Sequence, residues 1–165
     1  FRKGDAIKVY PSGNAGTIQS IEVNNRLVES AYAQQSVVLH LNEDIDISRG
    51  DTIVKDDESL KIGQEIESIV CWMDEKPLVA GNKYLLQHNS KTVRAVVKEI
   101  VYKIDVNTLN KETGTQTAVL NEVALVKLKT ASPLAYDSYQ KLRNNGAAIL
   151  IDETSYATSG ACMFS

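Results

Sequence analysis

The string Gly81-Asn82-Lys83 is the nearest match in this sequence to a nucleotide-binding pattern. Guanine is read by an Asn-Lys-x-Asp element, and position 85 holds Leu where the base-reading Asp would stand. A phosphate-binding loop needs Gly-x-x-x-x-Gly-Lys followed by Ser or Thr, so that backbone amides, the Lys and a magnesium-binding hydroxyl all meet the phosphates. No such string occurs in the sequence. We therefore expect that this chain alone does not bind GTP.

The segment Asp44-Ile45-Asp46-Ile47-Ser48 imitates the first half of a calcium loop, in which oxygens at alternate positions converge on the ion. The second half of the pattern fails, because Arg49 stands in place of the turn Gly and Lys55 in place of the bidentate Glu. We interpret the segment as a solvated hairpin edge, with Ile45 and Ile47 facing the core.

The remaining reactive side chains are scattered. His40 and His88 have no Cys, His or carboxylate at metal-ligand spacing. His40 alternates with apolar neighbours and should face solvent or a neighbouring domain, whereas His88 falls in a predicted turn. Cys71 and Cys162 lie in apolar runs and are predicted to be buried free thiols, and Trp72 is predicted to pack in a core or between domains. The sequence thus predicts no catalytic, cofactor-binding or metal-binding residue.

The elements that would position these residues are strands, because the dominant hydrophobic period is two and runs rich in Val, Ile, Thr and Tyr alternate with Gly, Asn, Asp and Pro. We predict an all-β chain with one weak helical turn within 134–144. Slips in the alternation predict β-bulges at Gln19-Ser20 and near Lys98-Glu99. The predicted strands cover 5–10, 17–23, 37–41, 52–54, 65–73, 83–87, 91–105, 120–129, 147–151 and 157–164.

A polar, acidic stretch without apolar alternation predicts a domain boundary. We expect a partial β-barrel over 1–56, a linker over 57–64 and a six-stranded β-barrel over 65–165. The chain opens on a turn signal in mid-pattern, which suggests that the first barrel is incomplete at its N-terminus and that its open edge pairs with a second copy.

One turn pattern recurs before strands, in Arg2-Lys3-Gly4-Asp5 and Ser48-Arg49-Gly50-Asp51, with a weaker echo in Lys61-Ile62-Gly63-Gln64. Gly gives the backbone freedom for a tight turn, and Asp can bond neighbouring backbone amides. We interpret these segments as the turns that open strands. The integrin-binding tripeptide within the second one is taken as coincidence.

Composition narrows the function classes. The chain has 165 residues and a formal net charge of -3, with Lys and Arg interspersed among Asp and Glu, so nothing favours binding to a phosphate backbone. No apolar run approaches the roughly 20 residues of a membrane-spanning helix, and no signal core follows the N-terminus. We expect a cytoplasmic protein that binds neither nucleic acid nor membrane.

The segment 37–54, above all Asp46-Ile47-Ser48-Arg49-Gly50-Asp51, resembles the second domain of the GTPase subunit of bacterial sulfate adenylyltransferase, a relative of elongation factor Tu. Further strings match that family in order over nearly the whole chain. They are 9–13, 71–73, 77–78, 101–107, 149–152 and 159–163.

The resemblance implies two barrels like the second and third domains of elongation factor Tu. In that family GTP hydrolysis drives the transfer of AMP from ATP to sulfate, which yields adenosine 5'-phosphosulfate and pyrophosphate. GTP and Mg²⁺ would be bound by an N-terminal domain absent from this sequence, and the transfer would belong to a small partner subunit. The expected role is docking and coupling without catalysis. The alternatives are the tRNA-binding barrels of an elongation factor and a free-standing β-barrel adaptor.

Overall fold

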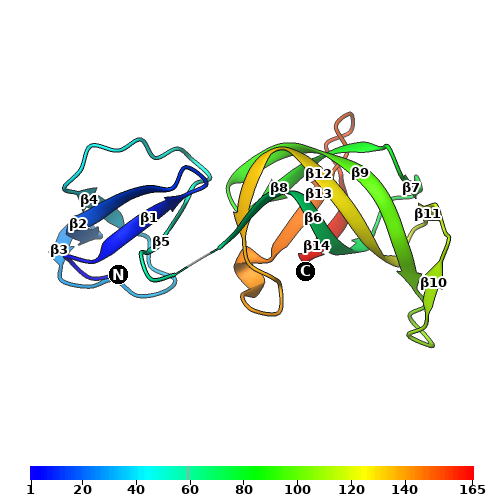
Figure 1. The fold of residues 1–165 in the computed structure, drawn as a ribbon, viewed down its shortest axis with the longest axis horizontal. Coiled ribbons are helices and arrows are strands. Elements are labelled where there is room, and N and C mark those ends of the chain that lie inside the picture. The colour runs from blue at the N-terminus through cyan, green and yellow to red at the C-terminus, as the bar shows by residue number, and fades with distance from the viewer. Residues whose placement is uncertain (59) are drawn as a thin grey trace. The chain divides into compact units, whose positions relative to one another are not determined.

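The computed structural model describes residues 1–58 and 60–165. The chain divides into two compact units, Phe1–Ser59 and Leu60–Ser165. Both are built from β-strands, and the helical element among the described residues is a short 3-10 turn, η1, at Arg143–Asn145 (Figure 1). The all-β prediction is confirmed.

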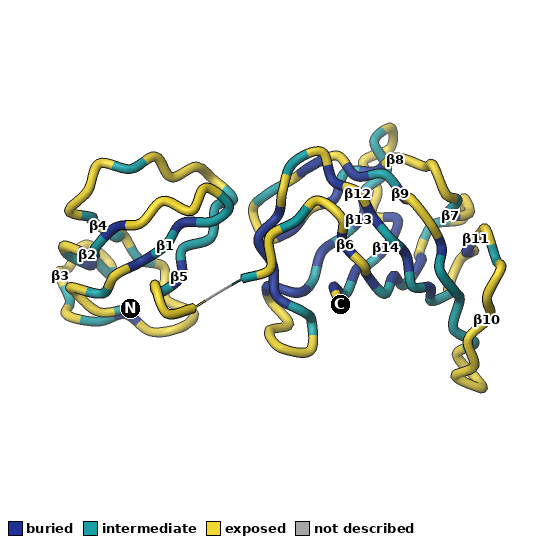
Figure 2. The backbone as a smooth tube through the Cα atoms, viewed as in Figure 1, coloured by how far each residue is buried: buried dark blue, intermediate teal, exposed yellow. Residues whose placement is uncertain are grey.

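The first unit is an open sheet. Its strands are β1 Ala6–Tyr10, β2 Asn14–Val23, β3 Arg26–Val28, β4 Val38–Leu41 and β5 Thr52–Lys55. They are hydrogen-bonded in the order β3-β2-β1-β5, and β4 also pairs with β2. Ile7, Val9, Ile18 and Ile21 are buried in its core, while the long connections are exposed (Figure 2). The pairing of β2 with β4 skips Gln19, so the predicted bulge is confirmed.

The two Gly-Asp turns have the same internal geometry. Gly4 and Gly50 have φ angles of 86° and 96°, which only Gly adopts freely. The Asp5 carboxylate accepts the backbone N–H of Arg2 at 2.8 Å, and the Asp51 carboxylate accepts that of Ser48 at 2.9 Å. These turns lead into β1 and β5, which pair with each other. The predicted role of both turns is confirmed.

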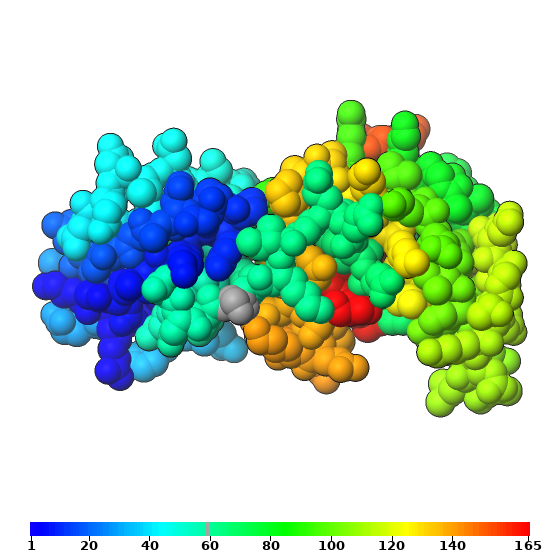
Figure 3. All heavy atoms as spheres, viewed as in Figure 1, coloured from blue at the N-terminus to red at the C-terminus, as the bar shows by residue number. Residues whose placement is uncertain are grey.

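The second unit contains a closed barrel. Six strands follow the order β9-β12-β6-β14-β13-β8, and the pairing of β8 with β9 completes the ring. They are β6 Lys61–Trp72, β8 Lys83–His88, β9 Lys91–Ile104, β12 Val123–Tyr136, β13 Ala147–Ile151 and β14 Thr158–Phe164. The short strands β7 Leu78–Val79, β10 Lys111–Thr113 and β11 Thr117–Ala118 lie outside the ring. The hairpin of β9 and β10 projects from the barrel (Figure 3).

Strand β9 carries two irregularities where one was predicted. Its register with β12 skips Lys98, which confirms the predicted bulge, and skips Val101 as well. The first skip changes the phase of the strand, so that Val97 and Ile100 are both buried although three positions apart. The barrel can therefore keep an apolar interior along this long strand.

Several expectations at element boundaries were wrong. Strand β6 already begins at Lys61, so the second half of the predicted 57–64 linker is strand, and Gly63 lies inside β6 rather than in a turn. Position 59 of that linker lies outside the described residues. The predicted helical turn over 134–144 fails at its start, because β12 runs to Tyr136 and the 3-10 turn begins only at Arg143.

The predicted hairpin edge at 44–48 was also wrong, because these residues adopt no strand conformation. Ile45 packs against the core of the first unit, but Ile47 is 40% exposed. Two apolar residues at alternate positions share a face only where the backbone is extended and pleated. Without a pairing strand here, the alternation does not carry both side chains inward.

Candidate functional site

The two histidines have opposite environments. His40 is exposed on β4 and pairs with Glu22 at 2.9 Å, as its position in the alternation predicted. His88 is the last residue of β8 and is buried, so its placement in a turn was wrong. Among the described residues, no group of His, Cys, Asp or Glu could hold a metal ion. No helix in the described part of the chain has the length and apolar character needed to span a membrane.

His88 belongs to a buried polar network at one end of the barrel. Its Nε2 donates to the carbonyl oxygen of Asn145 at 3.0 Å, and the Asn145 side chain accepts from Asn89 and donates to Asp137. Burial lowers the pKa of His88, while the Asn145 carbonyl opposes the shift. Burial also opposes ionisation of Asp137, but hydrogen bonds from Lys141 and Asn145 outweigh it and hold the pKa of that carboxyl below its usual value. The network fastens the 137–146 segment to the barrel.

The cysteines and the tryptophan serve packing. Cys162 is buried and Cys71 is half-buried, so the prediction of two buried free thiols holds fully only for Cys162. Burial raises the pKa of Cys162 to about 12, a value at which the reactive thiolate is scarce. Trp72 is buried against Tyr84, with ring centroids 5.5 Å apart, and its Nε1 donates to the Lys76 carbonyl at 2.9 Å. The packing interpretation of Trp72 is confirmed.

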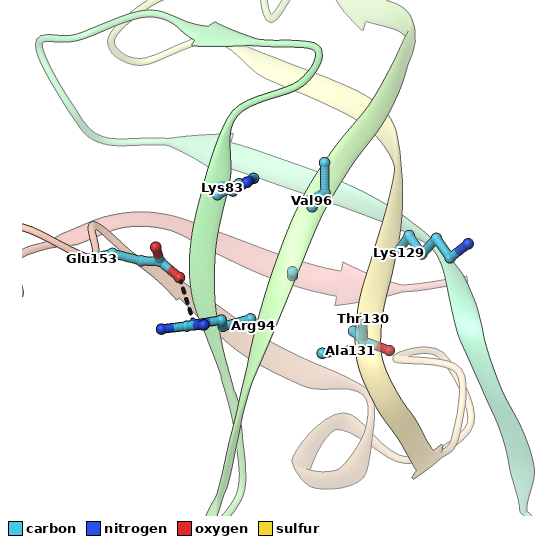
Figure 4. A pocket seen from close by; sticks show the side chains of 8 residues that line it. Lys83, Arg94, Val96, Lys129, Thr130, Ala131 and Glu153 are labelled. Carbon is cyan, nitrogen blue, oxygen red and sulfur yellow. Dashed lines mark ion pairs between the residues drawn. The ribbon is translucent and has the colours of Figure 1, made fainter.

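A concavity lies on the outer wall of the barrel, where β8, β9 and β12 run side by side (Figure 4). This wall pocket has a volume of about 420 Å³. Its floor includes Val96 and Ala131, and Lys83, Arg94 and Lys129 surround it. A single carboxylate, that of Glu153 from the β13–β14 connection, also lines it.

Strand register explains why two lysines meet at this pocket. Val96 on β9 lies directly opposite Lys83 on β8 and directly opposite Lys129 on β12. Directly paired residues share one face of a sheet, with Cβ atoms about 5 Å apart. Both lysines are therefore displayed beside the same apolar side chain, and Figure 4 shows them on either side of Val96.

The positive charge of the wall pocket is only partly compensated, unlike that of its surroundings. Neighbouring lysines are neutralised, Lys98 by Glu65 at 2.8 Å and Lys127 by Glu99 at 3.0 Å. Lys129 lies opposite Glu65 in register, but Lys98 occupies that carboxylate. Among the described residues, neither Lys83 nor Lys129 forms an ion pair with a carboxylate.

Arg94 is only loosely paired. Its Nε lies 3.5 Å from Glu153 Oε1, and the Arg94 side chain is 79% exposed. That carboxylate oxygen is buried and has no hydrogen-bond donor among the described residues. The ion pair is thus electrostatic without a hydrogen bond, and most of the guanidinium is open to a further anion. No residue of this pocket was predicted as a site, because Lys83 and Lys129 come together only through the register of the intervening strand β9.

Comparison with known proteins assigns the family. The family described as GTP-eEF1A C-terminal domain-like matches residues 65–165, which form the closed barrel. The chain belongs to this family. Solved structures agree with the fold over both units: sup35 complexed with GDP matches 99% of this chain and 40% of its own, with a TM-score of 0.89 and 14% identity. At that identity the likeness concerns the fold alone.

The chain is also similar to curated proteins that include a sulfate adenylyltransferase subunit and a bifunctional enzyme. Sulfate adenylyltransferase subunit 1 of Francisella tularensis is 41% identical over 160 residues, which are 97% of this chain and 34% of that protein. The bifunctional enzyme CysN/CysC of Mycobacterium tuberculosis is 38% identical over 164 residues, or 99% of this chain and 27% of its own length. The chain spans about a third, or less, of these relatives. The resemblance seen in the sequence is confirmed.

Proposed function

We propose that this chain is the non-catalytic β-barrel region of the GTPase subunit of a sulfate adenylyltransferase. The observation that carries the proposal is the 41% identity with a sulfate adenylyltransferase subunit 1 over 97% of the chain. The parent protein would take part in forming adenosine 5'-phosphosulfate and pyrophosphate from ATP and sulfate, driven by GTP hydrolysis. GTP and Mg²⁺ would be bound by its N-terminal domain, and the adenylyl transfer would belong to a small subunit.

The role of this region would be mechanical. A closed ring of six hydrogen-bonded strands around an apolar core moves as one body, because its strands cannot slide without breaking whole ladders. Such a body can dock on a GTPase domain and on a partner subunit, and nucleotide state can change how rigid bodies pack. The wall pocket, with three cations and one carboxylate, gives this body a surface feature suited to an anionic partner.

The test is assembly with a small subunit of a related sulfate adenylyltransferase. The purified chain should form a complex with that subunit in sedimentation velocity, and alone it should neither hydrolyse GTP nor make adenosine 5'-phosphosulfate. A guanine nucleotide binding isotherm in the micromolar range would contradict the non-catalytic role. If the chain binds neither the small subunit nor a separately supplied GTPase domain, the docking role is contradicted and a free-standing adaptor is favoured.

A further inference from the structure

We infer that the wall pocket of the second unit binds an acidic protein segment through Lys83, Lys129 and Arg94. The starting point is the register that places both lysines beside Val96. The inference rests on the proposed docking function in one respect, which is the identity of the partner protein that carries the acidic segment. The pocket itself can be tested without that protein.

The charge balance favours an anionic occupant. Three cationic side chains surround the pocket against the one carboxylate of Glu153. On the same wall, the lysines next to them are held by carboxylates at 2.8 Å and 3.0 Å. Lysines without an ion-pair partner in their own chain can pair with the carboxylates of a binding partner. Such charge complementarity sets orientation and specificity at interfaces.

The shape favours side chains over a polyphosphate backbone. The pocket, at about 420 Å³, has the size of a small-ligand site, and Val96 and Ala131 give it an apolar floor. A Glu side chain offers methylene groups to such a floor and a carboxylate to the lysines. A nucleic acid backbone would extend beyond the pocket onto the adjacent part of the same wall, where the lysines are already paired with Glu65 and Glu99. It would also meet Glu67, whose carboxylate forms no ion pair among the described residues. The described part of this wall therefore offers no further free cation to a phosphate backbone, which disfavours RNA.

Arg94 adds a geometric preference. A guanidinium binds a carboxylate through two parallel N–H donors, but here Arg94 approaches Glu153 only through Nε at 3.5 Å. The outer edge of the guanidinium remains available to a second carboxylate. The pocket therefore fits a segment with at least two acidic side chains, one for the lysine pair and one for Arg94.

The experiment is an NMR titration of the ¹⁵N-labelled chain with the peptide Ac-Glu-Glu-Leu-Glu-Glu-NH2. The peptide should produce saturable shifts at the amides of Val96, Lys129 and Ala131, and Ac-Gln-Gln-Leu-Gln-Gln-NH2 should produce none. The double variant Lys83→Gln/Lys129→Gln should weaken binding about tenfold, because two surface ion pairs are lost. Lys127→Gln is the matched control, since Lys127 lies on the same strand but is held by Glu99, and it should leave affinity within about twofold.

All of these side chains are exposed or half-buried, so folding of the variants is checked simply by their amide spectra. The absence of saturable shifts, or equal affinity of the double variant, would overturn the inference. Tighter binding of a short oligouridylate to the same amides would overturn it in favour of an RNA surface. A chain that assembles with the small subunit but does not bind the peptide would refute the pocket's ligand and leave the proposed function standing. A chain that binds the peptide but does not assemble with the small subunit would support the pocket's ligand and contradict the proposed function.

Discussion

The His88 ring nitrogen lies 3.0 Å from the carbonyl oxygen of Asn145, inside the end of the barrel. This hydrogen bond needs only a neutral imidazole, and the surroundings disfavour a charged one. Burial lowers the pKa of His88 below its usual 6.5, and the positive charge of Lys91 adds to the shift. The burial of His88 therefore makes the stability of the second unit depend on pH.

Acidification should destabilise the second unit through His88. Because the pKa is lower in the folded chain, the unfolded chain binds the proton first, so stability is lost as pH falls below about 6.5 toward the folded-state pKa. Urea unfolding followed by Trp72 fluorescence should show this loss. The variant His88→Gln should flatten the dependence in this range, while His40→Gln, at an exposed site, should keep it. A flat profile for the unmodified chain would contradict the assignment.

Replacing Gly146 by Ala should destabilise the barrel strongly. An added Cβ would collide with backbone atoms of Tyr139, which cannot move as a flexible side chain can. Overpacking of this kind typically costs about 1–3 kcal/mol, and a backbone collision should fall at or above the upper end. Gly63→Ala is the control, because its nearest atom would be the Glu65 carbonyl oxygen at an ordinary 3.7 Å. Equal unfolding midpoints for the two variants would be inconsistent with this packing.

The two thiols should react at different rates. Cys71 is half-buried, whereas Cys162 is buried and has its pKa raised to about 12. Under native conditions a disulfide reagent should modify Cys71 first and reach Cys162 only on the time scale of opening of the barrel. Mass mapping of the modified peptides checks the order, and Cys71→Ser should remove the fast phase. Fast modification that persists in this variant would show that Cys162 is accessible.

The Asp5 turn should matter more than the Asp51 turn. Asp5 accepts the Arg2 amide and also pairs with Lys55 at 3.0 Å, and hydrogen bonding from Lys55 is the main reason that the pKa of Asp5 is lowered. For Asp51 the recorded side-chain contact is the Ser48 amide. Hydrogen exchange of the β1 and β5 amides should therefore speed up more in Asp5→Ala than in Asp51→Ala. The reverse order would contradict the role of the cross-strand pair.

The open sheet of the first unit should associate at high concentration. Among the described strands, β5 pairs only with β1, so its other edge is free to accept a strand from a second copy. Sedimentation should show a weak, concentration-dependent increase in mass. Thr52→Lys places a charge on this edge strand and should suppress association. A chain that stays monomeric at millimolar concentration would show that the edge is covered.

The sequence predicted the strands of the barrel because their alternation is long and interrupted only by bulges. Gln19 and Lys98 could be located from a slip in that alternation, since a bulge must restore the phase of the apolar face. The second bulge, at Val101, was not predicted, because the sequence pattern around it could not be separated from the change of phase near Lys98. Local periodicity also misled at Ile47, which it placed in the core although the side chain is exposed because no strand pairs with this segment.

The wall pocket could not be predicted from sequence, because its lysines come from strands that are distant in the chain. Lys83 and Lys129 become neighbours of Val96 only through the register of β9 with both flanking strands. The register with β12 depends on the two skips in β9, each of which shifts every later pair by one residue. His88 was misplaced for a related reason, since its burial depends on Asn145, far along the chain.

The order of strands around the barrel has a consequence for synthesis. The first strand of the ring, β6, lies between β12 and the last strand, β14. A ribosome releases the chain from its N-terminus, so one edge of β6 has no native partner until residues 158–164 have left the exit tunnel. During that interval the growing chain carries an unfinished sheet, and unpaired edges of this kind invite misassembly. A chaperone that protects the nascent chain would have to cover the free edge of β6 until β14 has left the tunnel.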